Sequence, residues 1–243
     1  MGSIVRIPSF PFRRLLFLHR TRKAESTTPD WSNRGGIVGR GVLLDYVAYA
    51  DRKGIKYDPM SRHEITVADL DAIIADEKLT LRAGDVLIVR SGWVKWYNEA
   101  SEEQRLAKVK NGHEHCGVKA CEETMRWLWD HHFAAIAGDQ VAFEAWPPQP
   151  PWSECPFFRF SAPLGNLGAM VYTTSWLDAN VISLAVIHDF SLALWGEPIG
   201  ELWDLERLSE ICKEQNRWSF FLTSSPLNIH GGVSSPPNVL AIF

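Results

Sequence analysis

Short, continuous apolar runs alternate along the chain with longer segments in which apolar residues recur at helical spacing. The continuous runs predict buried strands at 42–46, 85–90, 133–137, 218–222 and 238–243. Helical spacing predicts helices that begin after Thr66 and after the capping box at Ser101, and further helices at 119–130 and 204–215. Strands interleaved with helices in this way are typical of a mixed α/β chain that folds as one domain.

The first part of the chain lacks such a pattern. Residues 1–34 show no sustained period and are expected to be irregular. Several glycines follow, between Gly35 and Gly41, directly before the first predicted strand. A dinucleotide-binding loop follows a strand and opens a helix, so the position of these glycines favours a turn.

Composition narrows the class of protein. The chain has 243 residues, of which 46% are hydrophobic and 22% charged, as in ordinary globular proteins. The net charge of −4 lacks the basic footprint of nucleic-acid-binding proteins, so a small-molecule partner is expected and nucleic acid is not. No apolar stretch reaches the roughly 20 residues that a membrane-spanning helix needs, so no membrane span is expected.

Charge and cysteine content add two further expectations. Residues 1–30 hold six basic and two acidic residues, which marks them as a basic segment distinct from the rest. The four cysteines form no Cys-x-x-Cys motif and are too few for a disulfide framework. A reducing, cytoplasmic location is therefore expected.

Histidines and cysteines occur close together in two places. His113, His115, Cys116 and Cys121 are metal ligands by type, but their spacing matches no zinc finger, and a solvated loop is the favoured interpretation. The pair His131–His132 ends a predicted helix, where an imidazole interacts well with the helix dipole.

Three other residues suggest a functional site. Asp139 follows a predicted strand, and in open α/β sheets the carboxyl ends of strands are where sites form, although Asp is also a common turn residue. His188 and Glu201 are of the ligand types that suit zinc or manganese. Two ligands do not make a site, so the pattern alone leaves a metal site and a structural pair both open.

A series of short segments occurs in a characteristic order. The segments include Tyr57-Asp58-Pro59, Ser61-Arg62-His63, Arg90-Ser91-Gly92-Trp93, Ala137-Gly138-Asp139, Phe143-Glu144-Ala145-Trp146-Pro147 and Pro198-Ile199-Gly200-Glu201-Leu202. Together they resemble the fungal branch of the cyclase family, whose best-known members are metal-dependent kynurenine formamidases. The resemblance covers about residues 31–155 and 186–243.

The resemblance implies a fold and a domain plan. It implies an α/β, swivelling β/α/β fold around a central β-barrel-like sheet, truncated at the N-terminus, in a protein that forms homo-oligomers. Residues 31–243 would form the cyclase-like domain, with an insertion near 157–186, and 1–30 would be a divergent basic segment.

The resemblance also implies site residues. His188 and Glu201 fit the places of two metal ligands, whereas Asp139, Arg90, Ser91 and Trp93 fit the wall of the substrate pocket. The family's main metal motif, His-x-Gly-Thr-His or Thr-Gln-Trp-Asp in fungal members, has no counterpart in residues 1–30. A catalytic zinc has about three protein ligands, so weak binding of zinc or manganese is expected, and no catalytic acid or base is assigned.

Two functions remain open on the sequence alone. In the first, the protein is a hydrolase in which a metal-bound water cleaves a small aromatic amide, as in the conversion of N-formylkynurenine to kynurenine in tryptophan catabolism. In the second, the missing motif leaves a catalytically degenerate cyclase fold that binds a small molecule or a partner.

Overall fold

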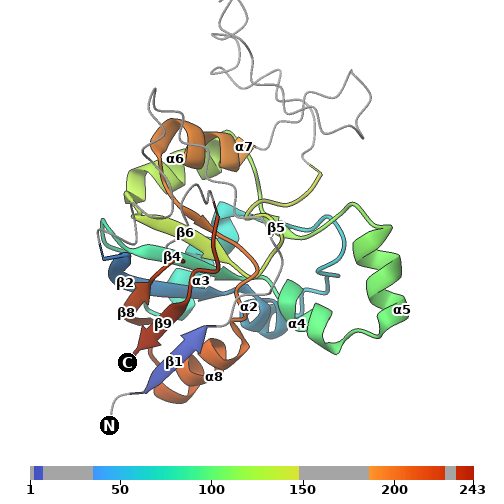
Figure 1. Cartoon of the computed structure of the whole chain (residues 1–243), viewed down its shortest axis with the longest axis horizontal. Helices are drawn as coiled ribbons and strands as arrows, with labels where there is room; N and C mark the ends of the chain where they lie inside the picture. The colour runs from blue at the N-terminus through green and yellow to red at the C-terminus, as the bar shows by residue number, and fades with distance from the viewer. Residues whose placement is uncertain (1–2, 8–34, 148–185, 228–233) are drawn as a thin grey trace, which may run out of the picture.

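A computed structural model of the chain describes residues 3–7, 35–147, 186–227 and 234–243 (Figure 1). Seven strands form one sheet and two short strands form a second. The strands are β1 Ile4–Ile7, β2 Ile37–Asp45, β3 Glu64–Ile65, β4 Val86–Arg90, β5 Gly117–Val118, β6 Ala135–Gly138, β7 Ile199–Gly200, β8 Ser219–Ser224 and β9 Val239–Ile242.

The helices pack around this sheet, and two segments are wound as π-helices. The α-helices are α2 Tyr46–Lys53, α3 Val67–Asp76, α4 Trp93–Glu99, α5 Glu102–Arg105, α6 Glu122–His131, α7 Val186–His188 and α8 Glu206–Gln215. The π-helical segments are η1 Leu106–Lys110, which continues α5, and η4 Asp189–Trp195, which continues α7.

The main sheet has the order β1-β9-β8-β2-β4-β6-β7 and combines two kinds of pairing. Strands β2, β4, β6 and β7 are parallel, whereas β8, β9 and β1 are joined to them by antiparallel pairs. The sheet curls into a half-barrel, which confirms the predicted α/β fold with a barrel-like sheet.

Strand β4 shows why the central strands read as continuous apolar runs. Its side chains alternate between two buried clusters, with Leu87 and Val89 on one face and Val86 and Ile88 on the other. A parallel strand that is covered on both faces needs apolar residues at every position.

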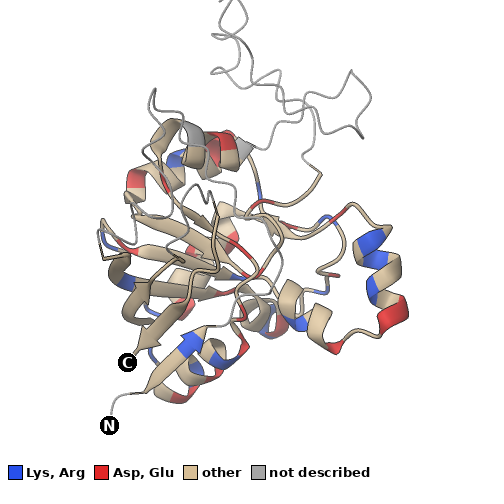
Figure 2. Cartoon of the chain, in the orientation of Figure 1, with Lys and Arg blue, Asp and Glu red and all other residues tan. Residues whose placement is uncertain are grey.

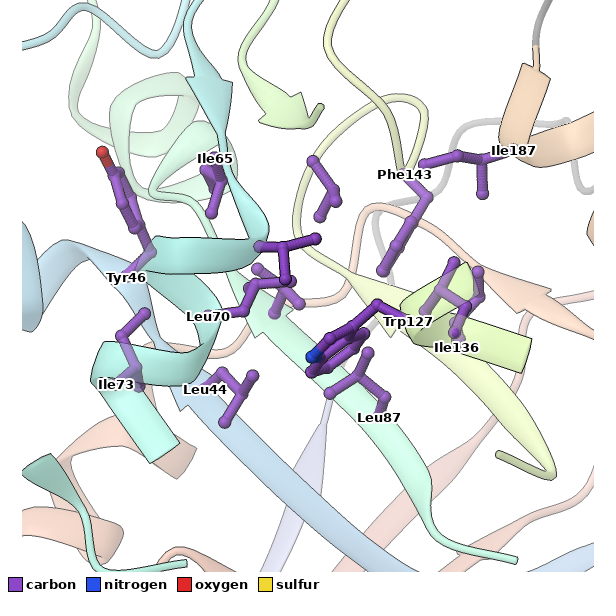
Figure 3. Packing of buried hydrophobic residues seen from close by; sticks show 14 of the residues in the cluster. Leu44, Tyr46, Ile65, Leu70, Ile73, Leu87, Trp127, Ile136, Phe143 and Ile187 are labelled. Carbon is purple, nitrogen blue, oxygen red and sulfur yellow. The ribbon is translucent and has the colours of Figure 1, made fainter. Parts of the chain in front are cut away.

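Different helices cover the two faces. On one face, α2, α3 and α6 contribute Tyr46, Leu70 and Trp127 to the cluster around Leu87 (Figure 3). On the other face, α8 contributes Leu208 and its neighbours to the cluster around Ile88. Charged residues are frequent on α5 and α8 and absent from β6 and β9, as expected for solvated helices around a buried sheet (Figure 2).

The predicted N-cap at Thr66 and the predicted capping box at Ser101 are both confirmed, and Thr66 also forms a capping box. At the start of α3, the Thr66 hydroxyl accepts a hydrogen bond from the backbone N–H of Asp69, and the Asp69 carboxylate accepts one from the backbone N–H of Thr66. Ser101 and Gln104 make the same reciprocal pair at the start of α5. Each cap satisfies backbone donors that a helix leaves free at its amino end.

Other expectations are corrected. Residues 1–34 were expected to be irregular, but Ile4–Ile7 forms β1 and pairs with β9. The predicted turn at Gly35–Gly41 is partly a strand, since β2 begins at Ile37 and the missing side chain of Gly41 makes room for the ring of Phe220. The helix expected at 119–130 begins at Glu122, because Lys119 still bonds to Ile65 of the short sheet.

Two expectations fall wholly or partly outside the described residues. The insertion proposed near 157–186 lies outside them except for Val186, and the basic segment 1–30 is described only at residues 3–7. None of the helices in the described ranges has the length and apolar character of a membrane span.

Candidate functional site

Polar side chains gather where the parallel strands end. Strands β4, β6 and β7 are neighbours and run in the same direction, so the residues that follow them, Ser91, Asp139 and Glu201, lie along one edge of the sheet. In parallel sheets this edge is where ligand sites commonly form.

His188 meets Glu201 at this edge. The two atoms Nε2 of His188 and Oε1 of Glu201 are 2.9 Å apart. His188 ends α7, and the preceding Ile187 is fully buried in the cluster that contains Phe143 (Figure 3). The structure therefore brings together the two residues that the resemblance assigns to a metal.

Glu144 completes a line of three side chains and was not singled out by sequence reasoning. Its Oε2 lies 2.7 Å from Nδ1 of His188, and its Oε1 accepts a 3.4 Å hydrogen bond from the His188 backbone N–H. The Glu144 side chain is 1% exposed, whereas His188 is 24% exposed. A single acidic residue inside the apolar segment 141–146 was the available signal, because a buried acid needs a partner.

The backbone around Glu144 explains its position. Val118 of β5 forms an isolated bridge with Glu144, and His115 forms one with Trp146. A side chain at Gly117 would collide with the Glu144 backbone, so this close approach requires glycine. Pairing with the small sheet thus positions the Glu144 carboxylate next to His188.

The two carboxylates dominate the electrostatics of His188. Burial lowers the pKa of His188, but Glu144 and Glu201 outweigh it and raise the pKa to about 10. Burial raises the pKa of Glu201, with His188 opposing it, and burial together with Glu144 raises the pKa of Asp189 to about 6. The cluster combines one imidazole with three acidic side chains, those of Glu144, Glu201 and Asp189.

Asp139 stabilises the neighbouring strand end. Its carboxylate accepts hydrogen bonds from the backbone N–H and hydroxyl of Ser91, at 2.6 and 2.8 Å, and from the backbone N–H of Gly92 at 2.7 Å. Burial raises the pKa of Asp139 to about 6 although these donors oppose it. Asp139 and Ser91 are fully buried and mutually bonded, so they shape the turn after β4.

Arg90 lies in a buried network of ion pairs, and its place in a substrate wall stays a prediction. It is 4% exposed, and its guanidinium donates to Asp45 at 2.7 Å and, through two nitrogens, to Glu206 at 2.9 and 2.8 Å. The alternation along β4 directs Arg90 to the face that α8 covers, since Val86 and Ile88 lie in that cluster.

Trp93 is also buried, in a third cluster with Met60 and Val94. Its ring stacks on Tyr97 with centroids 5.4 Å apart, and Leu202, the residue after Glu201, packs against the same cluster. Trp93 thus belongs to the buried cluster against which the residue after Glu201 packs.

The histidine and cysteine cluster predicted on a solvated loop is only partly solvated. His113 is exposed, but Cys116 is fully buried and His115 is half-buried beside Glu144. Burial lowers the pKa of His115. Of the pair at the end of α6, Nδ1 of His131 contacts the Trp127 carbonyl at 2.7 Å and His132 is the left-handed cap residue, which confirms their structural role.

The donor set can be tested against a metal. Within the described ranges no group of three His, Cys, Asp or Glu side chains is placed to hold an ion. Nε2 of His188 and Oε1 of Glu201 are two suitable donors, fewer than the three protein ligands that a catalytic zinc uses. The described residues therefore offer two possible donors and do not form a complete metal site.

Comparison with known proteins identifies the family. The Cyclase family model matches residues 18–145, more than half of the chain. The chain belongs to the cyclase family. The match includes Ser91, Asp139 and Glu144, whereas His188 and Glu201 lie beyond it, so the structure alone places these two beside Glu144.

Solved structures of cyclases and hydrolases share the fold. A crystal structure described as a novel cyclase is 27% identical, with a TM-score of 0.64 over 88% of this chain and 56% of that chain. Isatin hydrolase A from Ralstonia solanacearum is 15% identical, with a TM-score of 0.53 over 90% of this chain and 64% of its own. Isatin hydrolase A from Labrenzia aggregata, bound to benzyl benzoate, is 15% identical with a TM-score of 0.52 over 90% and 65%.

This cyclase spans less than two thirds of the length of each of these structures. No curated protein matches its sequence.

Proposed function

We propose that this cyclase is a hydrolase of C–N bonds in small aromatic amides, of the kynurenine formamidase type. N-formylkynurenine is the proposed substrate, and His188 and Glu201 are proposed to contribute to a zinc or manganese site. The observation that carries the proposal is the 2.9 Å contact between Nε2 of His188 and the Glu201 carboxylate at the carboxyl end of parallel strands. Family membership supports it, and so does the fold shared with enzymes named isatin hydrolases.

Glu144 would select the nitrogen of His188 that faces the metal. Its buried carboxylate accepts a hydrogen bond from Nδ1, so Nε2 is the nitrogen that faces Glu201 and that would bind a cation held there after giving up its own proton. Carboxylates that hold a ligating imidazole in this way also raise its basicity. When bound, a divalent ion lowers the pKa of its water and polarises the carbonyl of an amide.

A second candidate function rests on the donor count. Two donors in the described residues favour weak metal binding, and a cyclase fold with an incomplete site would act as a small-molecule or partner-binding module. This protein would bind an aromatic amide without hydrolysing it.

The two candidates differ in metal content and turnover. The purified chain is loaded with Mn²⁺ or Zn²⁺, dialysed and assayed for metal per chain and for kynurenine formed from N-formylkynurenine. Hydrolysis that is lost in both His188→Ala and Glu201→Ala, with metal content falling in parallel, supports the hydrolase. His113→Ala, at an exposed histidine, is the matched control and should retain both properties.

Binding of N-formylkynurenine without turnover would establish the binding module. Hydrolysis that persists in both variants would contradict the assignment of His188 and Glu201. The proposal also includes a cytoplasmic location and self-association; sedimentation of the same samples tests the self-association.

A further inference from the structure

A second pocket lies at the opposite ends of the same parallel strands. Its volume is about 280 Å³, close to the lower end, roughly 300 Å³, of small-molecule pockets. Phe133 and Ala134, before β6, and Gly196 and Glu197, before β7, line it. It is therefore separated from Glu201 by the length of the strands and is no part of the site described above.

Two helical segments end at this pocket. Helix α6 ends at His131, and its last turn lines the pocket through Leu128 and Trp129. The segment η4 ends at Trp195, and Gly196 caps it in the left-handed conformation. Figure 1 shows the two helical segments next to each other, and their ends contribute partial negative charge from free carbonyl groups.

Glu197 adds an acidic group that lacks a counter-ion. Its Oε2 is buried without a hydrogen-bond partner, and within the described part of the chain no ion pair involves it. Burial raises the pKa of Glu197 to about 7, with Ser191 opposing the shift. A buried carboxylate without a partner is costly, and a bound cation would remove that cost.

Two indole rings line the same pocket. The centroids of Trp129 and Trp195 are 5.2 Å apart and their planes are tilted by 53°, so the rings form an open wedge. Trp129 is 55% exposed, which leaves a ring face accessible. Indole faces attract organic cations more strongly than any other side-chain ring does.

We propose that this pocket binds a small organic ammonium ion, with its charge near Glu197 and its alkyl groups against Trp129 and Trp195. The helix ends, the unpaired carboxylate and the aromatic faces independently favour positive charge. A bare metal ion is disfavoured, because the metal-ligand types in the lining are one carboxylate and the imidazole of His132, too few to replace its water ligands.

Equilibrium titration with choline and tetramethylammonium tests the proposal, using the full chain and calorimetry or tryptophan fluorescence. The neutral isostere 3,3-dimethylbutan-1-ol separates charge recognition from apolar burial, and sodium chloride controls for ionic strength. We expect saturable binding of both cations and binding of the alcohol that is about tenfold weaker or more, since contacts to a charged group exceed neutral ones.

Single substitutions show which side chains contribute to cation binding. Glu197→Gln should weaken cation binding about tenfold or more, whereas Glu99→Gln, at an exposed carboxylate, should leave it unchanged. Trp129→Leu keeps apolar area but removes the ring and should weaken binding about two- to fivefold, and Trp129→Phe should recover part of the loss.

Three results would overturn the proposal: no saturable binding, equal binding of the alcohol and choline, or undiminished binding in Glu197→Gln. If Glu197→Gln does not fold, the exposed position Trp129 decides the matter, because an unchanged affinity in Trp129→Leu also contradicts the proposal. None of these outcomes depends on metal at His188 or on hydrolysis, so the two proposals fail separately.

Discussion

The charged cluster around Arg90 and the cluster around His188 differ in how completely their charges are balanced. Around Arg90, two basic and two acidic side chains alternate: Arg90 bonds to Asp45 and Glu206, and Lys213 lies 3.4 Å from Asp45. Although burial acts to raise the pKa of Asp45, Arg90 and the Ser209 hydroxyl hold it below its ordinary value. This cluster has no remaining charge with which to attract a ligand.

The His188 cluster is unbalanced. One imidazole lies between the carboxylates of Glu144 and Glu201, and Asp189 follows it in the chain. His188 is also partly exposed, so an ion from solvent can reach it. A balanced, buried cluster stabilises a fold or orders it, whereas an acidic cluster with an accessible imidazole is suited to bind a cation.

The largest expected effect concerns the balanced cluster. Arg90→Leu leaves the fully buried Asp45 without its main counter-charge and should lower the free energy of unfolding by about 3–5 kcal/mol. Urea denaturation measures the loss. Arg90→Lys keeps the charge but not the two-nitrogen contact with Glu206 and should lose less. A loss below about 1 kcal/mol, as for an exposed ion pair, would contradict a structural role.

A substitution in the cluster around His188 should change the affinity for metal. Glu144→Gln removes the carboxylate that holds Nδ1 of His188 and should weaken Mn²⁺ or Zn²⁺ binding by about 10- to 100-fold. Calorimetric titration measures the affinity. The matched change Glu206→Gln in the balanced cluster should leave it unaltered. Equal losses in both variants would mean that metal affinity follows overall stability and not the orientation of His188.

Glu77, which lies beside Asp45, should make the stability of the folded protein depend on pH. Its Oε1 accepts a hydrogen bond from the Asp45 backbone N–H at 3.3 Å, and its Oε2 is buried without a partner. Burial, with Asp45 adding to it, raises the pKa of Glu77 to about 9 from an ordinary value of 4.5. The folded chain therefore binds a proton that the unfolded chain releases between these values.

The contribution of Glu77 to stability is thus complete below about pH 4.5 and is lost as pH rises towards 9. The loss is about 1.4 kcal/mol per pH unit for one proton. Glu77→Gln should remove this slope, so unfolding curves of the two proteins should diverge as pH rises from 6 to 8. Parallel curves would show that Glu77 is ionised in the folded protein.

The smallest effect is expected at an exposed pair. Arg207 lies 2.8 Å from Glu210, and both side chains are solvated. Arg207→Ala should leave the unfolding midpoint unchanged, because solvent screens such a pair. A clear shift would contradict the screening of this pair by solvent.

Local patterns accounted for much of the fold. The continuous apolar run of β4 and the cap of α3 at Thr66 were predicted and confirmed, since each depends on neighbouring residues. The strand β1 was not predicted, because its pairing partner β9 lies at the other end of the chain. A four-residue strand of this kind has no local signal beyond its own alternation.

The site was accessible to sequence reasoning only in part. The family resemblance singled out His188 and Glu201, which the structure places in contact, while their binding of metal stays a proposal. Glu144 was missed because the contact spans 44 residues and depends on how the small sheet packs. The resemblance also assigned Arg90 to a substrate wall, which stays a prediction, whereas its bond to Asp45 on the face that α8 covers could be found only in the structure.

The sequence by itself determined the kind of protein: the periodicities specify strands and helices, and the order of short segments identifies a cyclase. Only the tertiary structure decided which charges meet, because a side chain's partners are set by strand register and by packing between distant segments. Ionic energies depend on distances of a few ångströms and on burial, and neither quantity exists until the chain has folded.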